Sequence, residues 1–118
     1  MATIKSYTDP EQSRKLAEIL PLESADGGWY GTNNPFAANT TYWLYTKYTE
    51  RAALPCWSLA ALFGVLPHID IEKKIYSDDT YGYRIKAYIR DGYIGDWYDN
   101  PVDACYDMIM RLNELNLL

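Results

Sequence analysis

The residues best suited to chemistry stand close together near the end of the chain, in the stretch DNPVDACYDMIMRLNEL (residues 99–115). Asp99, Asp103 and Asp107 supply carboxylates and Cys105 supplies a thiol, all within nine positions. General acid–base catalysis requires two acids that burial or mutual contact holds at one site. At helical spacing Asp103 and Asp107 instead share one polar side, which is typical of a solvent-facing helix surface. We therefore interpret the stretch as architecture and predict no catalytic residue in it.

The same stretch carries the signals of a helix start followed by a core helix. Asn100 stands where an N-cap is expected, Pro101 suits the first helical position, and Asp103 places a negative charge in the first turn. Asp107 and Arg111 are spaced to form an ion pair on the exposed side. The opposite side predicts a core-facing apolar stripe made of Val102, Cys105, Met108, Ile109, Leu112 and Leu115.

The other candidate groups for catalysis or metal binding lack the companions that they would need. His68 is the only histidine, so no catalytic pair or multi-histidine metal site can include it. Ser58 lies in CWSLA, which lacks the GxSxG pattern of hydrolases, and a helix N-cap explains it better. The aspartates do not follow the spacing of a calcium loop. We expect no enzyme activity, no metal and no cofactor; an enzyme would need a cleft in which Asp96, Asp99 and Asp103 converge.

Length and composition limit the class of protein. The 118 residues suffice for one core, so we predict a single domain over residues 1–118. The formal charge is −5 and no Lys/Arg block is present, which argues against nucleic acid as a partner. Cys56 and Cys105 lie in apolar runs without a CxxC pattern and are expected to be buried, reduced thiols. No apolar run resembles a signal peptide or a membrane span, so we expect no membrane partner and a cytoplasmic location.

Hydrophobic periodicity and turn residues predict an α+β fold, in which helices cover an antiparallel β-meander of three to four strands in a layered sandwich. The clearest strand pattern is YGYRIKAYIR, where Ile85 and Ala87 lie on one side and Arg84 and Lys86 on the other. Asp91-Gly92 predicts a two-residue hairpin turn. The expected elements are helices over about 10–20 and 56–67, a short strand at 29–30, a strand within 40–48, strands over 69–76, 81–90 and 93–99, and a final helix from 101.

The chain is rich in aromatic residues of one kind, with 12 Tyr and 4 Trp against 2 Phe. Tyr and Trp combine apolar area with a polar group, as at surfaces that bind proteins, sugars or bases. Aromatic residues are also favoured in strands, so packing between strands is the commoner explanation. If one sheet face stays open, it adds a small basic patch. The candidate interaction surface comprises Trp29, Tyr30, Tyr42, Trp43 and Tyr45, with Arg84 and Tyr88 in the basic patch.

Three segments, TDPEQSRKLAEILPLESAD, PCWSLAALFGVLP and DNPVDACYDMIMRLNELNLL, resemble small uncharacterised proteins from prophages and mobile elements of gut anaerobic bacteria. The order helix, helix, meander, helix is also similar to that of the phage ABA-sandwich domain. The resemblance implies a genetic context and supplies no catalytic residue. We therefore expect a small accessory protein that binds a protein partner without catalysis. The alternative is a small-ligand or carbohydrate-binding module that uses the aromatic segment 28–50, and Met110 together with an unassigned sheet face allows a homodimer.

Overall fold

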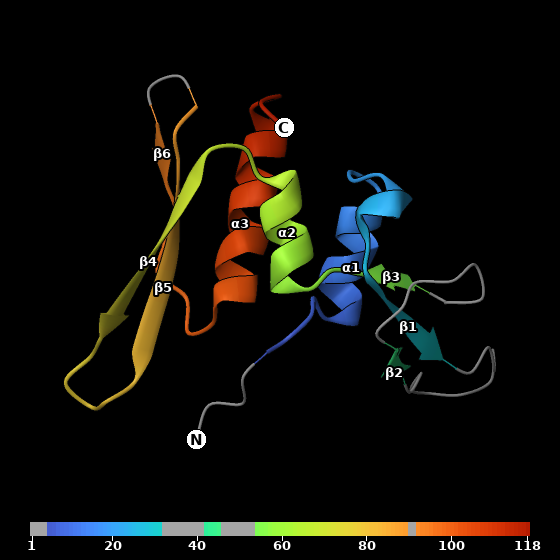
Figure 1. Cartoon of the computed structure of the whole chain (residues 1–118), viewed down its shortest axis with the longest axis horizontal. Helices are drawn as coiled ribbons and strands as arrows, with labels where there is room; N and C mark the ends of the chain where they lie inside the picture. The colour runs from blue at the N-terminus through green and yellow to red at the C-terminus, as the bar shows by residue number, and fades with distance from the viewer. Residues whose placement is uncertain (1–4, 32–41, 46–53, 90–91) are drawn as a thin grey trace.

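The computed structural model describes residues 5–31, 42–45, 54–89 and 92–118, which form three α-helices, a 3-10 helix and two antiparallel sheets (Figure 1). The predicted α+β class is confirmed, and a second sheet joins the predicted meander. One sheet has the strand order β4-β5-β6 and the other β2-β1-β3, with the helices between them in Figure 1. The elements are α1 Pro10–Ala17, η1 Leu22–Ser24, β1 Gly27–Gly31, β2 Tyr42–Tyr45, β3 Leu54–Cys56, α2 Leu59–Val65, β4 Ile69–Ile75, β5 Tyr81–Ala87, β6 Tyr93–Ile94 and α3 Pro101–Glu114.

Each α-helix begins at a side chain that accepts a hydrogen bond from the first turn. Asp9 caps α1 in a capping box, in which the Gln12 side chain bonds back to the Asp9 backbone N–H. Ser58 caps α2 and Asn100 caps α3, as predicted. The expected helix over 56–67 starts later than predicted because Cys56 belongs to β3, where it pairs with β1.

The meander sheet is built on β4 and β5, which pair along all seven residues of each strand. The predicted two-residue turn at Asp91-Gly92 is wrong, because the last pair between β5 and β6 is Ala87 with Tyr93, whereas that turn would require position 90 to pair with Tyr93. Asp91 itself lies outside the described residues. The Gly92 N–H instead donates to the Ile89 carbonyl (3.0 Å), so Gly92 closes a turn that begins at Ile89 and is not one of its central residues.

The third strand is shorter than the predicted 93–99, because an extra residue interrupts its pairing. Beyond β6 the chain pairs with β5 again only at Tyr83 and Tyr98, so that residues 95–97 lie opposite two residues of β5. This is a β-bulge, and a one-residue shift exchanges the faces of every side chain that follows. Gly95 suits the position because an added Cβ would lie 3.3 Å from the carbonyl oxygen of Ile85.

The core lies where α3 packs against β5 and α2. The apolar stripe predicted for the last helix is buried except at Leu115, which is 48% exposed because α3 ends at Glu114. Outside this stripe the buried apolar side chains come from α1, α2, α3, β3 and β5 and from the segments beside them. The fully buried core residues are Leu16, Cys56, Trp57, Leu62, Ile85, Val102, Cys105, Met108, Ile109 and Leu112.

Candidate functional site

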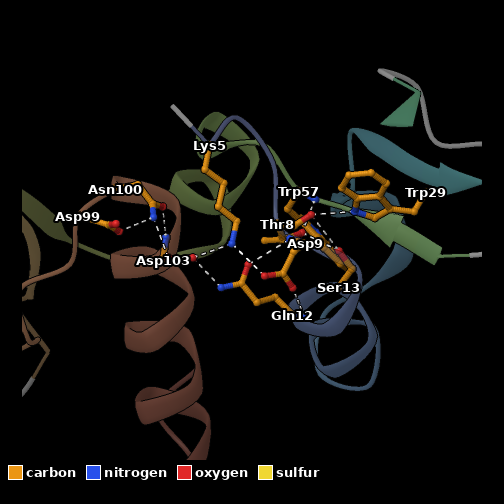
Figure 2. A network of polar contacts seen from close by, with 10 residues as sticks. All are labelled: Lys5, Thr8, Asp9, Gln12, Ser13, Trp29, Trp57, Asp99, Asn100 and Asp103. Atoms are coloured by element: carbon orange, nitrogen blue, oxygen red, sulfur yellow. Dashed lines mark hydrogen bonds and ion pairs between the residues drawn. The ribbon is translucent and has the colours of Figure 1, made fainter. Parts of the chain in front are cut away.

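The acidic start of α3 is joined to the N-terminal segment and to α1 by a polar network (Figure 2). Lys5 Nζ lies 2.8 Å from Asp103 Oδ1 and 3.0 Å from Asp9 Oδ2. Gln12 Nε2 and Asn100 Nδ2 each donate to Asp103, at 2.7 Å. The side chain of Asp103 is only 26% exposed, so its predicted solvent-facing position is wrong. Its carboxylate is instead the acceptor that connects α3 to α1 and to the chain before it.

The pKa values of the two central groups agree with this connecting role. Burial alone would raise the pKa of Asp103, but hydrogen bonds from Lys5, Gln12 and Asn100 outweigh burial and hold that pKa below its usual value. Burial alone would lower the pKa of Lys5, but its contacts with Asp103 and Asp9 raise it on balance. Both groups are therefore charged at neutral pH, where Asp103 has no proton to donate as a general acid.

The remaining carboxylates of this region have other partners, and two of them share Arg111. Asp99 is exposed and accepts from Asn100 Nδ2 (2.9 Å), whereas Asp96 accepts from an Arg111 Nη atom (2.6 Å). Arg111 Nε lies 3.0 Å from Asp107, which confirms the predicted ion pair, but the Asp107 side chain is only 23% exposed, so its predicted solvent-facing position is wrong as well. Across the part of the chain that the structure describes, no three His, Cys, Asp or Glu side chains gather as a metal site would require.

Two buried thiols and the half-buried Tyr98 are titratable groups that pack in or against the core. Cys56 and Cys105 are buried and unpaired, as predicted for reduced thiols. Burial raises the pKa of each thiol to about 12, with a contribution from Asp26 at Cys56. Burial and a hydrogen bond with Asp107 raise the pKa of Tyr98 to about 12. The thiols are thus protonated at neutral pH and poorly suited to act as nucleophiles.

These raised pKa values predict a loss of stability in alkaline solution. Each group binds its proton more tightly in the folded protein than in the unfolded one. Its contribution to the free energy of unfolding is therefore complete below the unfolded pKa and declines as pH rises through the folded pKa. We expect the free energy of unfolding, measured by urea denaturation, to fall between about pH 9 and pH 12. Cys105→Ala should weaken this dependence, and an unchanged slope would contradict the assignment.

The five aromatic candidates from segment 28–50 lie in the β2-β1-β3 sheet, on the other side of the helices from the meander (Figure 1). Trp29 and Tyr30 are half-buried in β1, and the Trp29 indole N–H donates to the Thr8 carbonyl (2.8 Å), so this ring helps to hold the fold. Tyr42, Trp43 and Tyr45 lie in β2, where Tyr30 pairs with Trp43 in the backbone register. The side chains of Tyr42, Trp43 and Tyr45 lie outside the described residues.

The other two candidates lie on the face of the β4-β5-β6 sheet that points away from α3, which we call the outer face. The described helices lie on the opposite side, where Ile85 and Ala87 are buried (Figure 1). Arg84 is half-buried, whereas Tyr88 is 57% exposed and donates its hydroxyl to Asp70 (2.9 Å). The outer face comprises Asp70, Glu72, Lys74, Tyr76, Arg84, Lys86, Tyr88, Ile94 and Trp97.

Trp97 lies on the outer face and was not part of the interaction surface predicted from the sequence. The guanidinium of Arg84 lies 4.5 Å from the centre of its ring, and Lys74 Nζ lies 4.3 Å from it. Cations at these distances are attracted to the face of an indole. Lys74 also lies 4.7 Å from the ring of Tyr76, which can pass over β5 because Gly82 has no side chain there. The result is a half-buried indole ring in contact with two cations.

The charges of the outer face are mixed and largely paired. Glu72 accepts from Arg84 Nε (2.6 Å) and forms a second ion pair with Lys86. Hydrogen bonds from Lys86 and Arg84 hold the pKa of Glu72 below its usual value. With Asp70 included, the face carries two carboxylates and three cations, which leaves one positive charge in excess.

Comparisons of the chain with protein-family models, with curated proteins and with solved structures found no match. The resemblance to prophage and mobile-element proteins therefore stays a prediction. No helix in the described part of the chain is long and apolar enough to cross a bilayer. The geometry of the outer face is the remaining basis for a functional proposal.

Proposed function

We propose that the protein is a non-catalytic binding protein and that the outer face of the β4-β5-β6 sheet contacts a protein partner. The observation that carries the proposal is Trp97, whose ring contacts Arg84 and Lys74 on a face that no described helix covers. Trp, Tyr and Arg are the residue types that contribute most to binding energy at protein interfaces. Because the ring is already positioned in the free protein, little side-chain entropy is lost on binding.

The charge pattern favours a protein over a nucleic acid as the partner. Phosphate binding depends on clustered Lys and Arg whose charge is free to neutralise the backbone. On the outer face Glu72 already contacts Arg84 and Lys86, and Asp70 adds a second negative charge. A surface with both signs of charge is suited to a protein surface of complementary pattern.

The setting that we propose, an accessory protein of a prophage or mobile element, is supported by the resemblance of the three segments alone. It is consistent with a function that needs a partner and no catalysis. A carbohydrate-binding module is the alternative, and it would use the aromatic residues of β1 and β2. Trp29 is less suited to that role than the sequence indicates, because its indole N–H is already bonded to Thr8.

Cross-linking from the outer face tests the proposal. We expect a photo-reactive amino acid at Tyr88 to cross-link one defined protein in the native host, and the same group at Leu22 of η1 to give no such product. Trp97→Ala should lower the yield at least tenfold, since loss of a central Trp costs on the order of 2 kcal/mol of binding energy. Yield is measured by mass spectrometry of the purified adducts.

The matched control is Leu22→Ala, which removes an exposed apolar side chain outside the outer face and should leave the yield unchanged. Equal products from positions 22 and 88, or a yield unaffected by Trp97→Ala, would contradict the proposed surface. Binding of a purified oligosaccharide that quenches Trp fluorescence, together with no protein adduct, would favour the carbohydrate alternative.

A further inference from the structure

The free edge of β4 is the second surface of this sheet, and the hydrogen-bond pattern shows which backbone groups it presents. The Tyr88 N–H donates to the His68 carbonyl and the Tyr76 N–H to the Thr80 carbonyl, each at 2.8 Å. Bonded and non-bonded pairs alternate along an antiparallel ladder, so the even-numbered residues of β4 bond to β5. The N–H and C=O groups of Ile69, Ile71, Lys73 and Ile75 therefore point away from β5, where no described strand pairs with them.

This edge is unusually open for a strand of its length. Natural edge strands are commonly short, bulged or interrupted by proline, because an exposed regular edge can pair with another chain. β6, at the opposite edge, is two residues long and ends in a bulge. β4 has seven regular residues, and Ile71 and Ile75 are 42% and 68% exposed. A hollow of about 660 Å³ lies beside its first half, with Phe63 of α2 on one side.

We infer that this edge pairs with β4 of a second copy of the chain, in an antiparallel arrangement about a twofold axis at Glu72. The sequence of β4, IDIEKKI, is acidic in its first half and basic in its second. The axis at Glu72 places Asp70 opposite Lys74 of the second copy, twice. It also places Ile69 opposite Ile75 of the second copy, twice, which brings the most exposed isoleucine to the hollow beside Phe63.

The alternative registers of a twofold pair are less favourable. The outward-pointing groups must meet each other, so the axis must pass through a residue of β4. An axis at Ile71 sets Asp70 opposite Glu72 of the second copy. An axis at Lys73 sets Glu72 opposite Lys74 twice, but it also sets Lys73, whose described partners are the rings of Tyr81 and Tyr83, opposite its own copy. Like charges that face each other across strands destabilise a pair. With the axis at Glu72 the only like pair is Glu72 with itself, and Arg84 and Lys86 already compensate that charge.

The dimer would join the two sheets into one of six strands, with both outer faces on the same side. Opposite residues of paired strands point to the same face, so the two Trp97 rings would lie on one continuous surface. Asp70, Glu72 and Lys74 belong to both the β4 edge and the outer face, but the pairing uses the backbone of β4 and does not require Trp97, so this inference does not rest on the proposed function. Trp97→Ala is expected to leave the dimer intact.

Cysteine cross-linking distinguishes the register. Because the N–H and C=O groups of Glu72 point to β5, the two Glu72 residues at the axis form a non-hydrogen-bonded pair. The Cα atoms of such a pair are about 4.5 Å apart, within disulfide range. Under mild oxidation Glu72→Cys should therefore yield a covalent dimer. Asp70→Cys, the matched control, would place its two thiols about four residues apart along the strands, roughly 13 Å, and should not cross-link. Cys56 and Cys105 are buried and leave the readout clear.

Light scattering of the unmodified protein provides the second measurement, and we expect a mass of twice 13.6 kDa that declines on dilution. Asp70→Lys and Lys74→Glu should each weaken the dimer about tenfold through two like-charge pairs. Mixing these two variants should restore a dimer, because the introduced charges are then opposite. A protein that stays monomeric at every concentration, or equal cross-linking at positions 70 and 72, would overturn the inference.

Discussion

Replacing Trp57 with alanine is expected to lower the free energy of unfolding by about 3 to 5 kcal/mol, the usual cost of removing a large buried aromatic side chain. Trp57 has no exposed surface, and its indole N–H donates to Ser24 Oγ (2.9 Å). Its backbone forms hydrogen bonds with Thr8, through the Thr8 N–H and the Thr8 hydroxyl. The residue therefore joins the N-terminal segment, η1 and the start of α2. Urea denaturation followed by far-UV circular dichroism measures the change.

Trp97→Ala is the matched comparison, since it removes the same side chain from the outer face. That ring is half-buried and contacts two cations, so we expect a loss of only about 1 kcal/mol. The two variants thus separate stability from binding. Trp57→Ala destabilises the core, whereas Trp97→Ala removes the proposed contact with the partner. Similar losses of stability in both would show that Trp97 belongs to the core, and the binding assignment would then lose its basis.

The helix starts and the core stripe of α3 were predictable from the sequence because each depends on neighbouring residues. A cap such as Asp9, Ser58 or Asn100 acts within its own first turn, and an apolar stripe repeats at helical spacing. The buried side of β5 was predictable for the same reason, because Ile85 and Ala87 alternate with polar residues. These signals need no knowledge of what packs against them.

The second sheet and the outer face depend on distant partners and were not predictable in the same way. β1 pairs with both β2 and β3, through Gly28 with Tyr45 and with Pro55, residues that carry no alternating pattern. Trp97 reaches the outer face only because the bulge at Gly95 shifts the pairing by one residue. A glycine within a strand pattern is a known signal of a bulge, and it was the one local indication of this shift.

The acidic stretch at the start of α3 gives the last prediction, in which stability rather than activity is expected to change. Asp103→Ala should lower the free energy of unfolding by about 2 to 3 kcal/mol, because the half-buried Lys5 would lose one of its two carboxylates and Gln12 its acceptor. Asp99→Ala is the matched control. Among the described residues its exposed carboxylate accepts a side-chain hydrogen bond from Asn100 alone, so the expected loss is within about 0.5 kcal/mol.

The pH dependence of this difference tests its cause. The pKa of Asp103 is lower in the folded protein than in the unfolded one. Its contribution to the free energy of unfolding is therefore complete above the unfolded pKa and is lost as pH falls through the folded pKa. The difference in stability between the wild type and Asp103→Asn should therefore be constant near neutral pH and shrink below about pH 4. If Asp103→Asn left stability unchanged but abolished a measured activity, the carboxylate would take part in a reaction and the stabilising role would be wrong. On the geometry of Lys5, Gln12 and Asn100 around it, we expect the opposite, because a carboxylate held by three donors contributes most as a permanent anion between two helices.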